Sequence, residues 1–224
     1  MIVYRGPSRL NGKRILVALT GHQGGSANRK TGSMAQSWIL AEGEHPAEAK
    51  HSGEDAAVCG DCPLRSNGCY VTMMAPGGVW KRERGAPVEA PKRLVSLRIG
   101  AYGDPAAVPA AVWRRLVKAA GGRWTGYTHF WRKRNAHALR ALCMASVETL
   151  VQARRAWSMG WRTYRIVPEG TKLEPNEIWC PYYTKGAQCI DCGLCNGVAK
   201  GHSTKSIAIP PHGPLRFKRI EVDK

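Results

Sequence analysis

The sequence has no long run of apolar residues. No stretch approaches the ~20 consecutive apolar residues of a membrane-spanning helix, and residues 1–5 do not form the apolar core of a signal peptide. Heptads, internal repeats and low-complexity runs are also absent. These absences exclude coiled coils, repeat arrays and integral membrane proteins. They predict a cytoplasmic protein that does not contact a membrane, and they leave its oligomeric state open.

Acidic residues are few. The 224 residues include 34 Lys and Arg but 16 Asp and Glu, which gives a formal net charge of +18. An excess of this size favours a polyanionic partner, and nucleic acid or a nucleotide is the first candidate. The alternatives are a solvated basic surface and a small substrate that carries phosphate.

Residues 93–167 predict a strand, a helix, two strands, a second helix and a strand. The strands are expected at 94–102, 124–129, 137–146 and 161–167, and the helices from Pro105 to the Gly121-Gly122 pair and over 148–159, because apolar periodicity and glycine stops bound them. Earlier strands are expected at 14–20 and 36–41, a linker at 77–91 and a last edge strand at 215–222. This alternation predicts an α/β fold, either a partial parallel βα barrel or an open sheet.

The two parts of the chain are expected at residues 1–175, a βα core with a cysteine loop, and residues 176–224, a C-terminal cysteine-rich metal lobe packed on that core. Functional loops of parallel βα units lie at the carboxyl ends of the strands. Tyr102, Asp104, His129 and Ser146 stand at or near such ends, so we expect them to converge on one rim as catalytic candidates. Asp104 is equally well explained as a helix cap.

Seven of the eight cysteines fall into two groups, and short spacings in a reducing compartment favour metal or cluster ligation over disulfides. Cys59, Cys62 and Cys69, the cysteine triad, have the spacing C-x2-C-x6-C. Three thiolates leave one coordination position open for a substrate or cofactor. The alternatives are a zinc knuckle completed by a histidine, and free thiols. The eighth, Cys143, lies in an apolar segment and is expected to be a buried structural thiol.

The second group has the spacing C-x8-C-x2-C-x2-C and predicts a closed four-ligand site. Overlapping C-x2-C pairs are typical of iron–sulfur proteins, and zinc is the alternative metal. His202 and His212 are spare ligand candidates. The group, here named the tail cysteines, consists of Cys180, Cys189, Cys192 and Cys195.

Two further segments carry cations. Trp131, Arg132, Lys133 and Arg134 follow the strand that ends near His129, and rings that stack on bases beside cations that bind phosphates predict a nucleic-acid patch. The alternative is a loop whose Trp131 packs inward. Residues 21–32 form a glycine-rich basic loop, which lacks the order of a P-loop or a dinucleotide fingerprint and favours a flexible basic loop over a nucleotide cradle.

Several segments resemble a bacteriophage protein family of unassigned function, which implies the cytoplasm of a bacterial host. The resemblance spans residues 28–197 and is carried by NRKTGSMAQSWIL, CGDCPLRSNGCYV, RIGAYGDPAAVP, GYTHFW and CPYYTKGAQCIDCGLCNG.

The order of motifs is also distantly similar to radical S-adenosylmethionine enzymes that carry an auxiliary cluster. In those enzymes three loop cysteines hold a [4Fe–4S] cluster and leave one iron for the cofactor. The resemblance implies that Cys59, Cys62 and Cys69 hold the cluster and that Gly103, Asp104 and Pro105 lie in the cofactor region. The triad departs from the usual C-x3-C-x2-C spacing of that superfamily.

Three functions follow from these patterns. The first is an iron–sulfur enzyme that modifies nucleic acid or a nucleotide, with a second cluster on the tail cysteines. The second is a zinc-stabilised nucleic-acid-binding protein without catalysis. The third is a metal-independent base or nucleotide transferase, or a hydrolase, that uses Asp104 as nucleophile or base and His129 as its acid–base partner.

Overall fold

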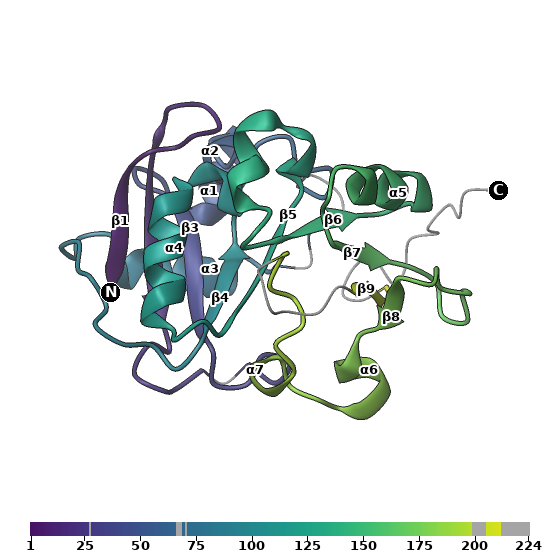
Figure 1. Ribbon diagram of the computed structural model, residues 1–224. Coiled ribbons are helices and arrows are strands. Elements are labelled where there is room, and N and C mark those ends of the chain that lie inside the picture. Colours follow the sequence, from purple (N-terminus) through teal and green to yellow (C-terminus); the bar gives the residue numbers. More distant parts are fainter. Residues whose placement is uncertain (27, 66–68, 70, 199–204, 212–224) are drawn as a thin grey trace.

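A computed structural model describes residues 1–26, 28–65, 69, 71–198 and 205–211. Within these residues nine strands form one open sheet in the order β1-β2-β3-β4-β5-β6-β7-β9-β8 (Figure 1). The β1–β2 and β2–β3 pairs are antiparallel, and every pair from β3 to β8 is parallel. The α/β class and the mostly parallel sheet are therefore confirmed. The strands are β1 (Ile2–Pro7), β2 (Arg14–Thr20), β3 (Ala35–Ala41), β4 (Leu97–Tyr102), β5 (Trp124–Thr128), β6 (Met144–Val147), β7 (Thr163–Ile166), β8 (Glu177–Trp179) and β9 (Ser206–Ile209).

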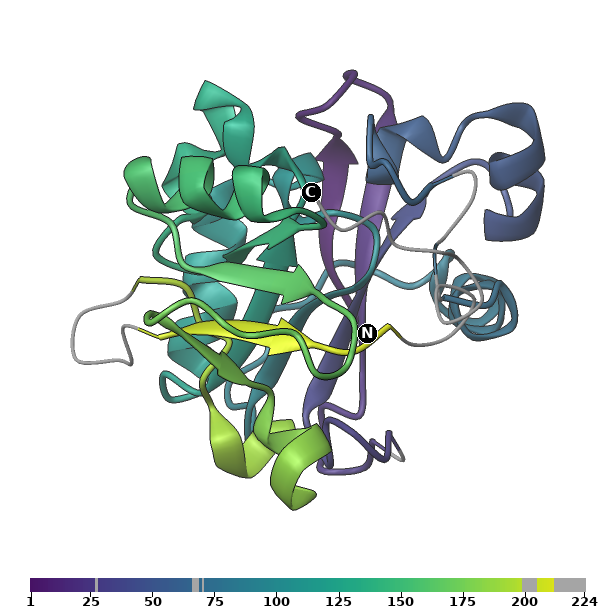
Figure 2. The same cartoon turned by 90° about the vertical axis from the view of Figure 1, so that its right-hand side faces the viewer.

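Helices lie on both sides of this sheet. Helices α4 and α5 pack on one side, and α1, α2 and α3 pack on the other beside β2 and β3 (Figure 2). None of the described helices is long and apolar enough to cross a membrane. The helices are α1 (Pro46–Ser52), α2 (Ala56–Cys59), α3 (Met74–Glu83), α4 (Ala110–Ala119), α5 (Leu150–Ser158), α6 (Pro181–Lys185) and α7 (Cys189–Cys192), with 3-10 turns η1 (Pro105–Ala107), η2 (Phe130–Arg132) and η3 (Arg134–Leu139).

The main core forms where apolar faces of α4 and α5 meet the sheet. Trp113 and Leu116 of α4 are fully buried, as are Leu97 and Ile99 of β4. Full burial of a side chain of leucine size contributes roughly 1.5–3 kcal/mol. Successive residues of a strand point to opposite faces, so burying Leu97 and Ile99 against α4 directs Arg98 to the other face.

Two elements begin later in the chain than the sequence predicts. The strand expected at 137–146 is wrong in its first part, because Ala136 and Leu139 are buried three residues apart, the spacing of the 3-10 turn η3. The helix expected from Pro105 is interrupted at Val108, which is extended with φ −113° and ψ 141°. The cause is Pro109, since a proline disfavours helical geometry in the residue before it.

The linker expected at 77–91 is also wrong in its first half. Helix α3 occupies Met74–Glu83, and its Trp80 is buried and donates from Nε1 to the Ala41 carbonyl oxygen at 2.9 Å. Burial of one large ring outweighs the poor helix propensity of the glycine pair in this segment.

The C-terminal part contributes strands to the same sheet. Strand β9 lies between β7 and β8 and pairs with both in parallel. A cysteine-rich lobe as a separate layer is therefore not confirmed. The edge strand expected at 215–222 and the ligand candidates His202 and His212 lie outside the described residues.

Candidate functional site

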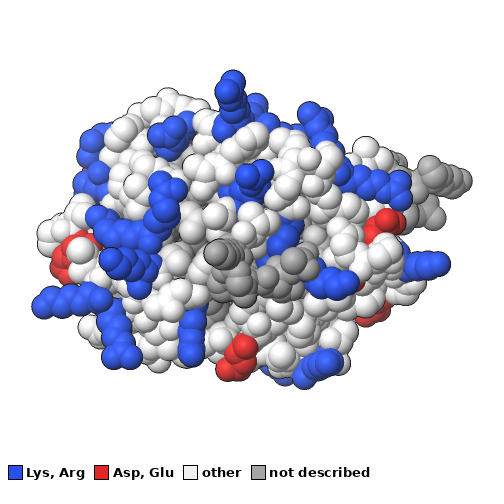
Figure 3. Space-filling view, in the orientation of Figure 1, with Lys and Arg blue, Asp and Glu red and all other residues white. Residues whose placement is uncertain are grey.

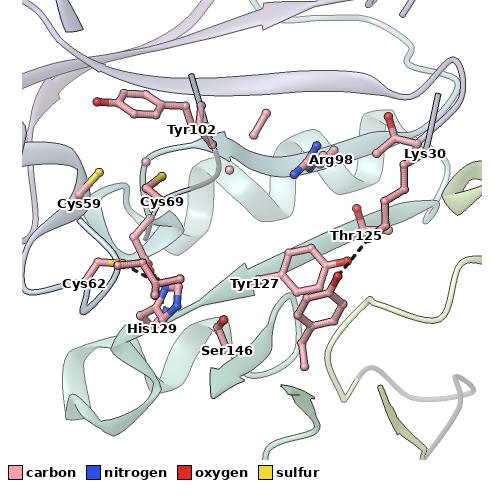
Figure 4. Close-up of a pocket in the computed structure, with 18 of the residues that line it drawn as sticks. Lys30, Cys59, Cys62, Cys69, Arg98, Tyr102, Thr125, Tyr127, His129 and Ser146 are labelled. Atoms are coloured by element: carbon pink, nitrogen blue, oxygen red, sulfur yellow. Dashed lines mark hydrogen bonds and ion pairs between the residues drawn. The ribbon is translucent and has the colours of Figure 1, made fainter. Parts of the chain in front are cut away.

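A pocket of about 250 Å³ lies on the sheet face opposite α4 and α5 (Figure 4). All four rim residues line it, which confirms that the carboxyl ends of β4, β5 and β6 bring them together. The triad lines the same pocket, and so does Cys189 of the tail cysteines. The residues of the three predicted groups that line it are Tyr102, Asp104, His129, Ser146, Cys59, Cys62, Cys69 and Cys189.

Asp104 joins the end of β4 to the end of β5. Its Oδ1 accepts hydrogen bonds from the Ala106 amide at 2.9 Å and from Thr128 Oγ1 at 2.7 Å, and its Oδ2 accepts one from the His129 amide at 2.8 Å. Burial raises the pKa of Asp104, although these bonds and the nearby His129 oppose that rise. Because both oxygens are engaged, the geometry supports the cap and gives little support to Asp104 as a nucleophile or base.

His129 lies between a thiol and a carboxylate. Its Nδ1 is 3.5 Å from Cys62 Sγ, and its Nε2 is 3.4 Å from Glu148 Oε1. Burial by itself lowers the pKa of His129, but the contacts with Cys62 and Glu148 and the charge of Asp104 outweigh burial and raise the pKa to about 10. Neither Nε2 nor Oε1 has an aligned hydrogen bond to a described residue, so charge alone holds this pair. Sequence reasoning missed Glu148, whose signal is its position directly after β6.

The triad spans the end of α2 and the loop after it, and Arg65 fixes this loop to the start of the helix. Arg65 donates from Nε to Asp55 Oδ1 at 2.8 Å and from Nη2 to the Gly53 carbonyl oxygen at 2.9 Å. All three thiols are half-buried. Burial raises the pKa of Cys59 and of Cys69, and the charges of neighbouring thiols raise both further.

Tyr102 and Ser146 lie on either side of the triad end of the pocket (Figure 4). Burial, followed by the charge of Cys59, raises the pKa of Tyr102 far above its ordinary value, so its hydroxyl keeps its proton. The backbone oxygen of Ser146 accepts a hydrogen bond from Trp131 Nε1 at 3.1 Å.

The tail cysteines all line a second, much smaller cavity of about 10 Å³. This volume holds about one water-sized sphere, which is enough for a single ion but not for a cluster unless the side chains move. Cys180 and Cys195 are buried, and burial raises the pKa of Cys195 to about 12. Cys189 lines this cavity as well as the large pocket, so both cysteine groups lie on the same side of the sheet, as expected.

In the described part of the chain, no three His, Cys, Asp or Glu side chains converge closely enough to hold a single metal ion. Both the triad and the tail cysteines would therefore have to draw together to bind one ion. Cysteines that hold a [4Fe–4S] cluster ligate different irons, so their sulfurs stand further apart than the ligands of one ion.

The end of the pocket away from the triad carries cations and tyrosines that sequence reasoning missed. Lys30, Arg98 and Thr125 lie on this side, and Tyr127 lies between them and His129 (Figure 4). The only sequence signal for Arg98 was its place in an apolar strand, where a cation on one face indicates a polar cavity there.

In the predicted nucleic-acid patch, the cations are exposed but the aromatic ring is not. The indole of Trp131 is fully buried, so its expected stacking on a base is wrong, and the inward-packing alternative is correct. The ring anchors η2 in the core. Arg132, Lys133 and Arg134 are exposed, and Lys133 Nζ is 3.8 Å from Asp61 in the triad loop. Figure 3 shows cations spread over one whole face, with few acidic side chains among them.

Comparison of the chain with protein-family models, with curated proteins and with solved structures gives no match.

Proposed function

We propose that this protein is an iron–sulfur enzyme, similar to radical S-adenosylmethionine enzymes, that acts on nucleic acid or a nucleotide. One observation carries the proposal: three half-buried thiols, one from the end of α2 and two from the loop after it, line the same pocket as the polar side chains at the carboxyl ends of three parallel strands. A metal group held there would face the rim where βα proteins place their chemistry.

Cys59, Cys62 and Cys69 would hold a [4Fe–4S] cluster, and the segment from Gly103 to Pro105 would contact S-adenosylmethionine at the open iron. Such a cluster supplies, when reduced, the electron for reductive cleavage of that cofactor. Gly103 allows the neighbouring chain to approach closely, because its φ of +79° and its contact with Ile39 leave no room for a side chain.

The chain's own residues have separate roles in this proposal. Asp104 positions the two strand ends through its three hydrogen bonds, and His129 contacts the thiol of Cys62. Tyr102 and Ser146 line the pocket, where the hydroxyl group of Ser146 can orient a bound molecule by hydrogen bonding. The small cavity among the tail cysteines favours a single zinc ion over a second cluster.

Support for a nucleic-acid substrate comes from charge. The net charge of +18 and the three exposed cations of η2 and η3 beside the triad loop suit a phosphate backbone. Because Trp131 is buried, its ring cannot stack on a base at this patch. Arg132, Lys133 and Arg134 are therefore assigned to phosphates.

The first experiment measures iron, sulfide and zinc per chain after anaerobic purification, together with 5′-deoxyadenosine formed from S-adenosylmethionine under reducing conditions. We expect about four irons and four sulfides per chain. The triple variant C59A/C62A/C69A should lose the iron and the product. The matched control is C143A, since Cys143 is a buried thiol outside the pocket and its removal should retain both. Iron that survives in the triple variant would refute the assignment.

The second experiment tests the substrate class. Replacing Arg132, Lys133 and Arg134 with alanine should weaken nucleic-acid binding and flatten its dependence on salt concentration. Unchanged salt dependence would remove the patch from the binding surface and favour a small-molecule substrate.

A zinc-stabilised nucleic-acid-binding protein is the second candidate, because the tail cysteines line a cavity of single-ion size. The same metal analysis separates the two functions. Zinc without iron, together with nucleic-acid binding and no cleavage of S-adenosylmethionine, would establish this alternative.

A further inference from the structure

A second hollow of about 360 Å³ adjoins the pocket. The two share Asn28, Val71, Arg98 and Ala101 in their walls, so they form one continuous depression. Residues of the glycine-rich basic loop line the outer hollow, and Trp38 and Gln36 of β3 line it from the sheet. This loop, to which the proposed function assigns no role, is therefore part of the wall.

Two cations line the end of the inner pocket away from the triad, and one of them, Arg98, also lines the outer hollow. The other, Lys30, lines the inner pocket from the glycine-rich loop. Tyrosines hold the ammonium group in place: Lys30 Nζ is 3.3 Å from the Tyr164 hydroxyl oxygen and 4.7 Å from the ring centroid of Tyr183. Figure 4 shows both cations at the end of the pocket away from the triad.

The inner pocket is otherwise poor in negative charge. Asp104 is the acidic residue among those that line it, and it lies at the triad end with its oxygens engaged by protein donors. Among the described lining residues, a phosphate at the two cations would therefore face no carboxylate.

Aromatic rings lie next to the cations. The rings of Tyr127 and Tyr164 have centroids 4.3 Å apart and an interplanar angle of 49°, and both line the inner pocket. Aromatic faces bind nucleobases without regard to sequence. A volume of about 250 Å³ is too small for a duplex.

We propose that the substrate is a single nucleic-acid strand, which places one nucleotide in the inner pocket and its neighbour in the outer hollow. The phosphate between them lies at Lys30 and Arg98, and the inner base lies against Tyr127 and Tyr164 with its far edge toward the triad. This inference deepens the proposed function and rests on it for the reaction, but the strand-binding site itself stands on the two hollows.

The test is fluorescence anisotropy of a labelled single-stranded octanucleotide with the anaerobically purified full chain. K30M should weaken binding about tenfold and reduce the slope of log affinity against log salt by about 1. The matched control is R29M, which removes the same charge from the neighbouring exposed residue of the loop and should change affinity less than about twofold. R98M should behave like K30M, and a duplex of the same sequence should compete poorly.

Three outcomes would overturn the inference. The first is an equal loss of affinity in R29M and K30M, which would show that only the general charge of the loop matters. The second is competition by a free nucleoside monophosphate at the same concentration as the octanucleotide, which would make the ligand a free nucleotide. The third is unchanged binding in K30M. Thermal unfolding of K30M and R29M should be compared to verify that both variants are folded.

Failure of this inference is distinguishable from failure of the proposed function. K30M should retain the iron content of the unsubstituted chain, since Lys30 lies at the opposite end of the pocket from the triad. Strand binding that follows the K30M and R29M pattern in a protein without iron would refute the enzyme and preserve the binding site. A protein that contains iron but does not bind a strand would refute the binding site and preserve the enzyme.

Discussion

The two cysteine groups of this protein differ in burial and in the space around them. The triad consists of half-buried thiols at the end of α2 and on the loop after it, and it faces a pocket of about 250 Å³. The tail cysteines face a cavity of about 10 Å³, and two of them, Cys180 and Cys195, are buried. A group held by the triad would therefore be accessible to other molecules, whereas an ion held by the tail cysteines would be more enclosed.

Backbone contacts extend this comparison. The amide of Cys180 donates to the Ala208 carbonyl oxygen in β9, and the Cys195 carbonyl oxygen accepts from the Gly126 amide in β5, both at 2.9 Å. The tail therefore bonds directly to two strands of the sheet. In contrast, the triad region is linked to the sheet edge through α2, whose Val58 carbonyl oxygen accepts from the Asp104 amide just after β4 at 2.7 Å. We expect the tail group to determine stability and the triad to determine activity.

The largest expected effect on stability follows removal of a tail cysteine. C195A should lower the free energy of unfolding by roughly 4 kcal/mol, because lost metal binding is lost folding energy and a buried thiol is removed as well. C59A should change it by about 1 kcal/mol while abolishing product formation. Chemical denaturation of both variants measures the difference, and equal destabilisation would break the comparison between the groups.

Arg162 should come next, since it holds the tail from the sheet side. It is buried and donates to the carbonyl oxygens of Leu194 and Gly197 at 2.7 Å and of Lys205 at 2.8 Å. R162M would leave these acceptors unsatisfied and should cost about 3 kcal/mol. The control is R155M, an exposed arginine on α5, which should cost less than about 0.5 kcal/mol. Thermal unfolding of the two variants provides the measurement.

Arg65 is the corresponding arginine of the triad loop, and its effect should be smaller. Its partner Asp55 is buried, but the guanidinium side chain is 27% exposed, so solvent weakens the pair. R65A should lower stability by about 1 kcal/mol and reduce product formation more strongly, because the loop loses its position. Iron content should fall in R65A and remain unchanged in R162M. If iron content fell in R162M and not in R65A, the two arginines would have the opposite roles.

The smallest expected effect is a pH dependence of stability at Glu42, which lies outside both cysteine groups. Hydrogen bonding from Arg14, supported by Arg5, outweighs burial and lowers the pKa of Glu42. A folded-state pKa below the unfolded value means that Glu42 stabilises the fold above its ordinary pKa of about 4.3 and loses this contribution as pH falls through the lower folded value.

Denaturation curves of E42Q and the unsubstituted chain should therefore differ by on the order of 0.5 kcal/mol at neutral pH and coincide at the acid end. The same difference should be found in the C59A background. A difference that depends on the triad would show that the Glu42 end of β3 is coupled to the cysteine loop.

Much of the fold could be predicted because local patterns decide it. The buried run of β2 and the strand before Gly103 are apolar enough to specify strands alone, and the Gly121-Gly122 pair ends α4 where expected. Errors arose where one residue outweighed a pattern. Pro109 moved the start of α4 to Ala110, and burial of Trp80 stabilised α3 although that helix contains a glycine pair.

The cysteine spacings and the excess of basic residues are properties of the sequence alone, and they are sufficient to propose metal and polyanion chemistry. Parallel strands then explain why Tyr102, Asp104, His129 and Ser146 meet, since their carboxyl ends share one edge. What only the tertiary structure decided is which side chains face which cavity. It buried Trp131, and it brought Glu148 to His129 and Lys30 to Tyr164, pairs that are 19 and 134 positions apart in the sequence. Contacts of this kind depend on how the whole sheet packs, and so no local pattern in the sequence specifies them.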